Sequence, residues 1–288
     1  SSNPLTARVI VNRVWQKHFG YGLVRSPNNF GVIGEKPTHP RLLDWLAHWF
    51  IKQGWSLKKL HHLIVTSQSY QMSRQLNPNY MKKDPENLLL WRLPRVRLEV
   101  EAIRDSMLAV SGRLNRKMFG PSMFPQISKG ALAGHSDPDT VWKPSIEEER
   151  SRRTIYVFLK RSMIVPMLEV LDLCDTTKTA PKRTTTNVAP QALTLFNGEF
   201  VNRQARYLAS RLENEVGTNW ERQIKRAFIL ALARPPTLHE KEVLLKFLKE
   251  ESQNQLDNSV ISFENARLVA LREMCRVILN LNEFVYPD

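Results

Sequence analysis

The sequence predicts a mainly α-helical protein with a minor two-stranded β element. Helix caps recur in the first quarter of the chain, apolar side chains follow a helical spacing in several later segments, and one short run is rich in β-branched and aromatic residues. Of the 288 residues, 42% are hydrophobic and 24% are charged, so the chain is able to bury a large core as one domain or two.

The N-terminal region, residues 4–72, is predicted to hold three helices. Asn3 before Pro4 is typical of an N-cap, and Gly20 is typical of a left-handed C-terminal cap, so the first helix is expected over residues 4–19.

Thr38 is expected to cap the second helix and Gly54 to close it, while Ser56 is expected to cap the third. Three helices in one short region must pack against one another.

The first helix carries the candidate cleft residues Asn12, Arg13 and Trp15. In one interpretation these side chains line a ligand cleft. In the other, which we favour, they bind backbone carbonyls and a carboxylate inside the core, because buried polar groups need partners.

The formal net charge of +14 is unevenly distributed. It amounts to +8 over residues 1–75, +2 over 76–150, +6 over 151–212 and −2 over 213–288. If the two basic segments share a face, they favour a polyanion such as nucleic acid or sulfated glycan, or an acidic protein. A scattered basic surface that keeps the protein soluble is an equally good interpretation.

The segment from Arg97 to Asn115 has the spacing of an amphipathic helix and places Glu101 and Asp105 one turn apart. Two close carboxylates can work as an acid and base pair, which makes them candidate catalytic residues. The favoured alternative is that both anchor arginines from other helices.

Residues 117–151 show no clear period and are expected to form a long irregular loop. His135 is a third catalytic candidate there, and Asp137, Asp139 and Trp142 lie near it in sequence. One His beside two Asp is weak evidence for a divalent ion, so no metal site is predicted.

The strand prediction depends on the run Ile155–Leu159, which is expected to pair with Leu88–Trp91. Arg161 follows this run and is a candidate anion-binding residue.

A second anion-binding candidate precedes a helix that Pro190 is expected to open. It consists of Arg183, Thr184 and Thr185, followed by Thr186, because the free N–H groups and the dipole of a helix N-terminus favour negative charge.

The C-terminal region, residues 204–288, is expected to form a helical bundle. Its helices are predicted at 204–215, 219–233, 238–251 and 263–281. Thr237 is expected to form a capping box with Glu240.

Several stretches resemble one known family. They include PLTARVIVNRVWQKHFGYGL near the start, RLEVEAIRDSMLAVSGRLN in the middle and KRTTTNVAPQALTLFNGEFV later. The chain is similar to a planctomycete-type domain of unknown function, numbered fifteen-fifty-three, that ends large exported proteins with cytochrome-c-type modules. The resemblance implies a single family domain over residues 4–288, a periplasmic or cell-surface location, and other modules of the parent protein as partners. It supplies no established catalytic residue.

Cys174 and Cys275 are far apart in sequence and belong to no C-x-x-C pair, so covalent haem attachment and a zinc ribbon are not predicted. They form either one disulfide or two buried thiols. No run is apolar enough to cross a membrane, and without an initiator methionine or targeting segment the chain is expected to be a piece of a longer precursor.

Three functional hypotheses follow. The first, which we favour, is a non-catalytic interaction or scaffold module without a cofactor. The second is a polyanion-binding domain. The third is an unrecognised hydrolase that uses Glu101, Asp105, His135 or His39, although the usual nucleophile, nucleotide-binding and metalloprotease motifs are missing.

Overall fold

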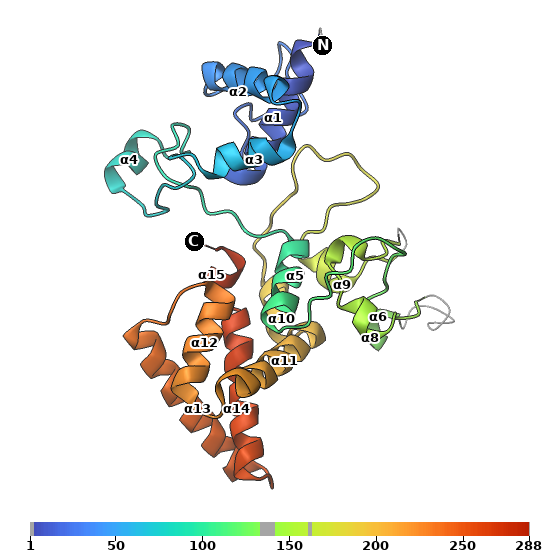
Figure 1. The fold of residues 1–288 in the computed structure, drawn as a ribbon, viewed down its shortest axis with the longest axis vertical. Coiled ribbons are helices and arrows are strands. Elements are labelled where there is room, and N and C mark those ends of the chain that lie inside the picture. The colour runs from blue at the N-terminus through green and yellow to red at the C-terminus, as the bar shows by residue number, and fades with distance from the viewer. Residues whose placement is uncertain (1–2, 133–141, 161–162, 288) are drawn as a thin grey trace. The chain divides into compact units, whose positions relative to one another are not determined.

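The computed structural model of the protein describes residues 3–132, 142–160 and 163–287. The chain folds into two compact units (Figure 1). Unit 1 comprises residues 1–96, 179–182 and 288, and unit 2 comprises residues 97–178 and 183–287.

Unit 1 contains the helices drawn in blue and cyan in Figure 1: α1 (Pro4–Phe19), α2 (Pro40–Lys52), α3 (Leu57–Val65) and α4 (Pro78–Lys83). The predicted bounds of α1 are confirmed. The side chain of Asn3 accepts a hydrogen bond from the N–H of Leu5, and Gly20 ends the helix with a φ of 77°.

The predicted cap of α2 is wrong. Its N-cap residue is His39, which makes no side-chain capping bond. Thr38 is held elsewhere, because both its N–H and its hydroxyl donate to the carbonyl of Leu23, at 2.9 Å and 3.4 Å. Ser56 caps α3 as predicted, by accepting from the N–H of Lys59.

The core of unit 1 forms where α1 packs against α2 and α3. α1 contributes Val11 and Trp15, α2 contributes Phe50, and α3 contributes Leu60 and Ile64, all of them buried. The apolar stripe of each helix therefore faces the same interior.

Unit 2 holds the remaining elements. They are α5 (Val100–Val110), α6 (Lys129–Leu132), α8 (Glu147–Arg150), the 3₁₀ turn η1 (Thr154–Tyr156), α9 (Pro166–Val170), α10 (Ala189–Asn197), α11 (Glu199–Val216), α12 (Trp220–Leu232), α13 (Leu238–Asn258), α14 (Phe263–Leu279) and α15 (Asn282–Val285).

The C-terminal bundle consists of α11, α12, α13 and α14, with α14 packed against both α13 and α11 (Figure 1). The face of α14 that includes Ala270, Met274 and Ile278 is fully buried. The predicted capping box is present, since the hydroxyl of Thr237 accepts from the N–H of Glu240 while the Glu240 carboxylate accepts from the N–H of Thr237.

The mainly α prediction is confirmed, but the predicted two-stranded element is not. Residues 88–91 form turns, and Ile155 lies in η1 with 73% of its surface exposed. Within the described residues, the strand-like run makes only an isolated bridge between Val157 and Met123. The reason is a distant partner: the N–H and the hydroxyl of Thr154 donate to the carboxylate of Asp105, and the N–H of Val157 donates to the Thr154 carbonyl, so the start of the run is held in a helical turn.

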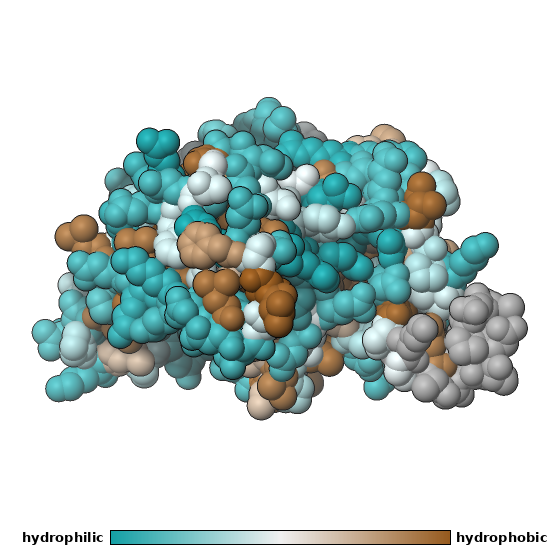
Figure 2. All heavy atoms as spheres, turned by 90° about the horizontal axis from the view of Figure 1, so that it is seen from below, coloured by the Kyte–Doolittle hydropathy of each residue, from teal (hydrophilic) through white to brown (hydrophobic). Residues whose placement is uncertain are grey.

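Figure 2 shows one face of the molecule, seen from below the view of Figure 1. Hydrophilic residues cover most of it, and hydrophobic residues lie in small scattered groups. Scattered apolar residues of this kind are normal on a protein surface. Among the described residues, no helix combines the length and the apolar character that crossing a bilayer requires.

Candidate functional site

Asn12, a predicted cleft residue, is fully buried in unit 1. Its Nδ2 donates to the carbonyl of Val24 at 2.9 Å, and its Oδ1 accepts from the N–H of the same residue at 2.8 Å. A Cβ on Gly22 would lie 2.5 Å from Nδ2, so this close approach requires glycine. Asn12 therefore holds the backbone of the segment that follows α1.

The other two cleft candidates differ in their surroundings. Arg13 is exposed and donates to Oδ1 of Asn28 at 3.3 Å. The Trp15 ring stacks on Phe19, with the ring centroids 4.2 Å apart, and lines a pocket of unit 1.

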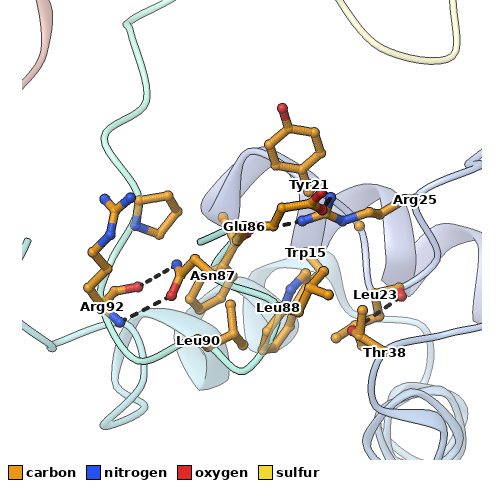
Figure 3. A pocket seen from close by; sticks show the side chains of 13 residues that line it. Trp15, Tyr21, Leu23, Arg25, Thr38, Glu86, Asn87, Leu88, Leu90 and Arg92 are labelled. Atoms are coloured by element: carbon orange, nitrogen blue, oxygen red, sulfur yellow. Dashed lines mark hydrogen bonds and ion pairs between the residues drawn. The ribbon is translucent and has the colours of Figure 1, made fainter. Parts of the chain in front are cut away.

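The pocket has a volume of about 140 Å³ (Figure 3). Its walls come from α1, from the segment that follows α1, from Thr38 and from the loop before residue 95. The lining residues are Trp15, Phe19, Tyr21, Gly22, Leu23, Arg25, Thr38, Glu86, Asn87, Leu88, Leu90, Arg92 and Pro94. It thus combines an aromatic and aliphatic interior with charged side chains.

One wall of the pocket carries an ion pair that joins two segments far apart in sequence (Figure 3). Nη1 of Arg25 lies 2.6 Å from Oε2 of Glu86, and Nη2 donates to the Glu86 carbonyl at 3.2 Å. The Arg25 guanidinium also lies 4.7 Å from the centroid of the Tyr21 ring, and Nζ of Lys182 lies 3.5 Å from it. The Tyr21 ring therefore makes cation–π contacts with two cations of unit 1.

The loop that completes the pocket is shaped by two polar side chains. The carboxylate of Asp84 accepts from the N–H groups of Leu88 and Leu89 at 2.9 Å and 2.8 Å. Asn87, at a φ of 54°, donates to the carbonyl of Arg92 at 2.8 Å and accepts from its N–H at 3.3 Å. These bonds fix the backbone of the loop without any regular secondary structure.

The candidate catalytic carboxylates lie on α5 in unit 2, and each anchors another segment. Glu101 receives a bidentate pair from Arg183, at 2.6 Å and 2.9 Å. These hydrogen bonds raise the pKa of the Arg183 guanidinium. Oδ1 of Asp105 accepts from both the N–H and the hydroxyl of Thr154, at 2.7 Å and 2.6 Å. Glu101 therefore anchors an arginine, as in the favoured interpretation, whereas the hydrogen bonds to Asp105 come from a threonine.

The structure therefore brings a predicted catalytic residue and a predicted anion-binding residue together in a single ion pair. Thr184 and Thr185 are exposed, whereas Thr186 is held by Asp172, which accepts from its N–H and its hydroxyl, both at 2.8 Å.

Several predicted residues of the loop region lie outside the described residues. They are the catalytic candidate His135, the anion-binding candidate Arg161, and both Asp137 and Asp139. Trp142 is described and is 1% exposed, with Nε1 donating to the carbonyl of Pro125 at 2.8 Å. It belongs to the core of unit 2 and presents no ring to solvent.

A buried network surrounds Arg97, which no sequence pattern indicates. Nη2 of Arg97 lies 2.6 Å from Oδ2 of Asp172, and Nη1 donates to the carbonyl of Thr186 and to Oε1 of Gln191. Burial by itself would raise the pKa of Asp172, but the hydrogen bonds from Thr186, Arg97 and Gln191 outweigh it, so the pKa is lowered. The partners Arg97 and Asp172 are 75 positions apart, a separation that local patterns do not reveal.

Two more arginines of unit 2 are buried. Arg104 donates to the carbonyl of Arg152 and to the hydroxyl of Thr154, both at 3.1 Å, and burial lowers its pKa to about 10. The Arg152 guanidinium lies 3.9 Å from the centroid of the Tyr156 ring. Both arginines connect segments inside unit 2.

Formal charge is divided unequally between the units. Unit 1 holds 15 Lys and Arg against 5 Asp and Glu, a net charge of +10. Unit 2 holds 27 against 23, a net charge of +4, although it is the larger unit. The basic character of the chain is therefore concentrated in unit 1.

Among the described residues, no three His, Cys, Asp or Glu side chains gather in a way that would hold a metal ion. Cys174 and Cys275 are both free thiols, and burial raises the pKa of the Cys275 thiol.

Comparison with known proteins places the chain in a family. No curated protein and no solved structure matches it significantly. A family model described as PSD1, protein of unknown function (DUF1553), matches residues 1–248, which include all of unit 1 except Asp288 and most of unit 2. The chain therefore belongs to the DUF1553 family.

Proposed function

We propose that the chain is a non-catalytic interaction module and that unit 1 binds polyanions. The observation that carries this proposal is the net charge of +10 on unit 1. A surface with this excess of positive charge attracts polyanions, and neutralising phosphate or sulfate groups releases their counterions.

The carboxylates of unit 1 leave most of this charge uncompensated. Asp84 is buried and accepts hydrogen bonds from the backbone, while Asp44 and Glu86 pair with Arg8 and Arg25. With 15 cations and only 5 carboxylates, one-to-one pairing is impossible inside the unit. The exposed cations of unit 1 include Arg13, Lys36, Arg41, Lys52, Lys58, Lys59, Lys82, Lys83 and Lys182.

Helix α2 supports the proposal with an exposed stripe that mixes cations and an aromatic ring. Arg41, Trp45, His48 and Lys52 follow one another at spacings of four, three and four, so they share one face of the helix. All four are exposed, and Trp45 keeps 52% of its surface accessible. A ring between cations suits a polymer that offers both negative charge and flat faces.

The hydrolase hypothesis receives less support. Glu101 is bound by Arg183, and Asp105 is bound by Thr154, so each carboxylate has a structural role that accounts for its position. A catalytic pair would require both carboxylates to face a substrate.

The proposal includes the location and partners that the family resemblance implies. In it, the chain is an exported part of a larger protein, exposed to the periplasm or the cell surface, where unit 1 meets anionic polymers or acidic proteins. Fractionation of cells that produce the parent protein tests the location.

Binding across a salt series tests the function. The full chain is titrated with a sulfated polysaccharide, with nucleic acid and with an uncharged glycan. We expect binding to at least one polyanion that weakens steeply with salt, and no binding to the uncharged glycan. Absence of binding to every polyanion at low salt would overturn the proposal.

A further inference from the structure

The pocket of Figure 3 narrows the class of polyanion. This inference rests on the proposed function, since it concerns the same unit. We propose that the pocket accepts a single pyrimidine base of a single-stranded nucleic acid, while the cations near it face the adjoining phosphates.

The size of the pocket fits one small ring. Its volume is about 140 Å³. An apolar cavity of about 150 Å³ holds a molecule of benzene. A six-membered pyrimidine ring is of similar size, whereas a purine has a second fused ring. The pocket therefore favours pyrimidines.

The inner surface of the pocket suits a flat aromatic ring. Trp15 and Phe19 are stacked on each other and are 6% and 2% exposed, so their positions are fixed before any ligand arrives. Leu88 and Leu90 add aliphatic side chains from the loop (Figure 3). A rigid apolar site loses little side-chain entropy when a ring enters it.

The polar groups of the pocket argue against a sugar as the occupant. Thr38 donates to the carbonyl of Leu23, Asn87 is bonded in both directions to the backbone of Arg92, and Arg25 is paired with Glu86. A pyranose buries several hydroxyl groups, each of which needs a partner. These side chains already have theirs, and a pyrimidine base, which has fewer polar groups than a pyranose, asks for fewer new partners when it enters the pocket.

The charge around the pocket is positive. Three cations, Arg25, Arg92 and Lys182, lie in or beside the pocket, and the lining residues include one carboxylate, that of Glu86. Nε of Arg92 is buried without a hydrogen-bond partner in the described part of the chain, and its guanidinium lies 5.1 Å from the Trp91 ring. This environment favours an anionic ligand that carries a flat ring.

A single-stranded nucleic acid combines a phosphate and an accessible ring face in every repeat. A duplex has the same phosphates, but its bases are stacked on one another and are not free to enter a pocket. A sulfated glycan has the charge without an aromatic ring. The pocket therefore favours a single strand over a duplex and over a sulfated glycan, whereas the charge of unit 1 attracts all three.

Two neighbouring residues provide a matched pair of variants. Leu88 lines the pocket, whereas Leu89 does not line it and is 72% exposed. L88W fills the pocket without changing the charge, and L89W adds the same ring to the same loop outside it. Binding of the full chain to fluorescent oligothymidylate, to a duplex of mixed sequence and to heparin is measured for both variants by anisotropy.

We expect L88W to weaken binding to oligothymidylate by about fivefold or more, the range that loss of one base–aromatic stack produces. L89W should bind like the wild type, and neither variant should change binding to heparin. Equal affinity of L88W and wild type for oligothymidylate would overturn the pocket assignment and leave the proposed function intact. If the wild-type chain binds none of the three polymers, the proposed function itself fails.

A photochemical experiment tests the pocket assignment with the wild-type chain, so the result does not depend on whether L88W folds. A strand that contains 5-iodouracil is crosslinked to the wild-type chain, and the modified peptides are identified by mass spectrometry. We expect crosslinks at Trp15 or Tyr21, which line the pocket. Crosslinks confined to Trp45 or to unit 2 would overturn the pocket assignment.

Discussion

Unit 1 and unit 2 use basic side chains in opposite ways. In unit 2, Arg97, Arg104 and Arg152 are buried and bind carbonyls or carboxylates from distant segments. In unit 1, many of the cations are exposed lysines, and carboxylates are few. A guanidinium has several N–H donors and connects segments well, while a lysine on the surface mainly contributes charge. Net charge therefore indicates a binding surface only after the structural cations are identified.

The largest effect that tests this contrast is expected at Arg97. R97M leaves the half-buried carboxylate of Asp172 without its cation, and the carbonyls of Leu171 and Thr186 without a donor. Loss of one partner of a buried pair is expected to lower the free energy of unfolding by about 3 kcal/mol. Urea unfolding of the full chain measures it, with R222M, at an exposed arginine of α12, as the control. If both variants unfold at the same urea concentration, Arg97 is not a structural cation.

A smaller loss of stability is expected at Asn12 in unit 1. N12A removes both bonds to Val24 and leaves a buried N–H and a buried carbonyl unsatisfied, which costs about 1–3 kcal/mol. The control is N28A, at an exposed residue that contacts Arg13. Urea unfolding should separate the two variants. A stable N12A protein with weakened polyanion binding would restore Asn12 as a cleft residue.

Acid sensitivity of unit 2 should depend on Glu240. Hydrogen bonds from Arg234, and further ones from Thr237, lower its pKa to about 2 from 4.5. A lowered pKa means that this carboxylate stabilises the fold above pH 4.5 and that the contribution is lost as the pH falls toward 2. E240Q should therefore be less stable than wild type at pH 7. Between about pH 4.5 and 2 its free energy of unfolding should fall by less than that of the wild type. Thermal unfolding across that pH range measures the difference, and parallel pH curves for the two proteins would contradict it.

The smallest effect is expected at His18 in unit 1. Burial, together with the charge of His61, lowers the pKa of His18 below 6.5, and the two rings share a hydrogen bond of 2.7 Å. Because the pKa is lowered, His18 contributes stability above pH 6.5 that is lost as the pH falls below that value.

An NMR titration of the imidazole signals tests this prediction. In H61Q the pKa of His18 should rise toward its ordinary value, because the neighbouring charge is gone. H62Q, one position further along α3, is the matched control and should leave it unchanged. Equal shifts in the two variants would show that His61 has no specific effect.

Local features of the fold were predictable from the sequence. The caps at Asn3, Gly20, Ser56 and Thr237 act on backbone groups only a few residues away, so the residues that form them are adjacent in the sequence. The mainly α class followed from these caps and from apolar periodicity.

Features that depend on distant partners were not predictable. Thr38 has the side chain of an N-cap, but the carbonyl of Leu23, 15 residues earlier, holds its hydroxyl. Glu101 and Arg183 were assigned separate functions, and only the fold brings them together across 82 positions. The pocket shares this property, since its walls come from the first helix and from a loop beyond residue 84. Of the predicted cleft residues, Trp15 alone lines it.

The assignment of polyanion binding to unit 1 is tested by removing charge from each unit in one assay. One variant replaces four exposed lysines of unit 1, as K58Q, K59Q, K82Q and K83Q, and its control replaces four of unit 2, as K143Q, K178Q, K225Q and K249Q. Both lose the same formal charge. Binding of each full-length variant to heparin and to oligothymidylate is measured from low to high salt.

We predict that the unit 1 variant binds at least about tenfold more weakly and has a shallower dependence of affinity on salt, because it has lost direct contacts with the polyanion. The unit 2 variant should stay within about twofold of wild type, since general electrostatic attraction is screened beyond a distance of about 10 Å. Equal losses in the two variants would contradict the assignment of polyanion binding to unit 1.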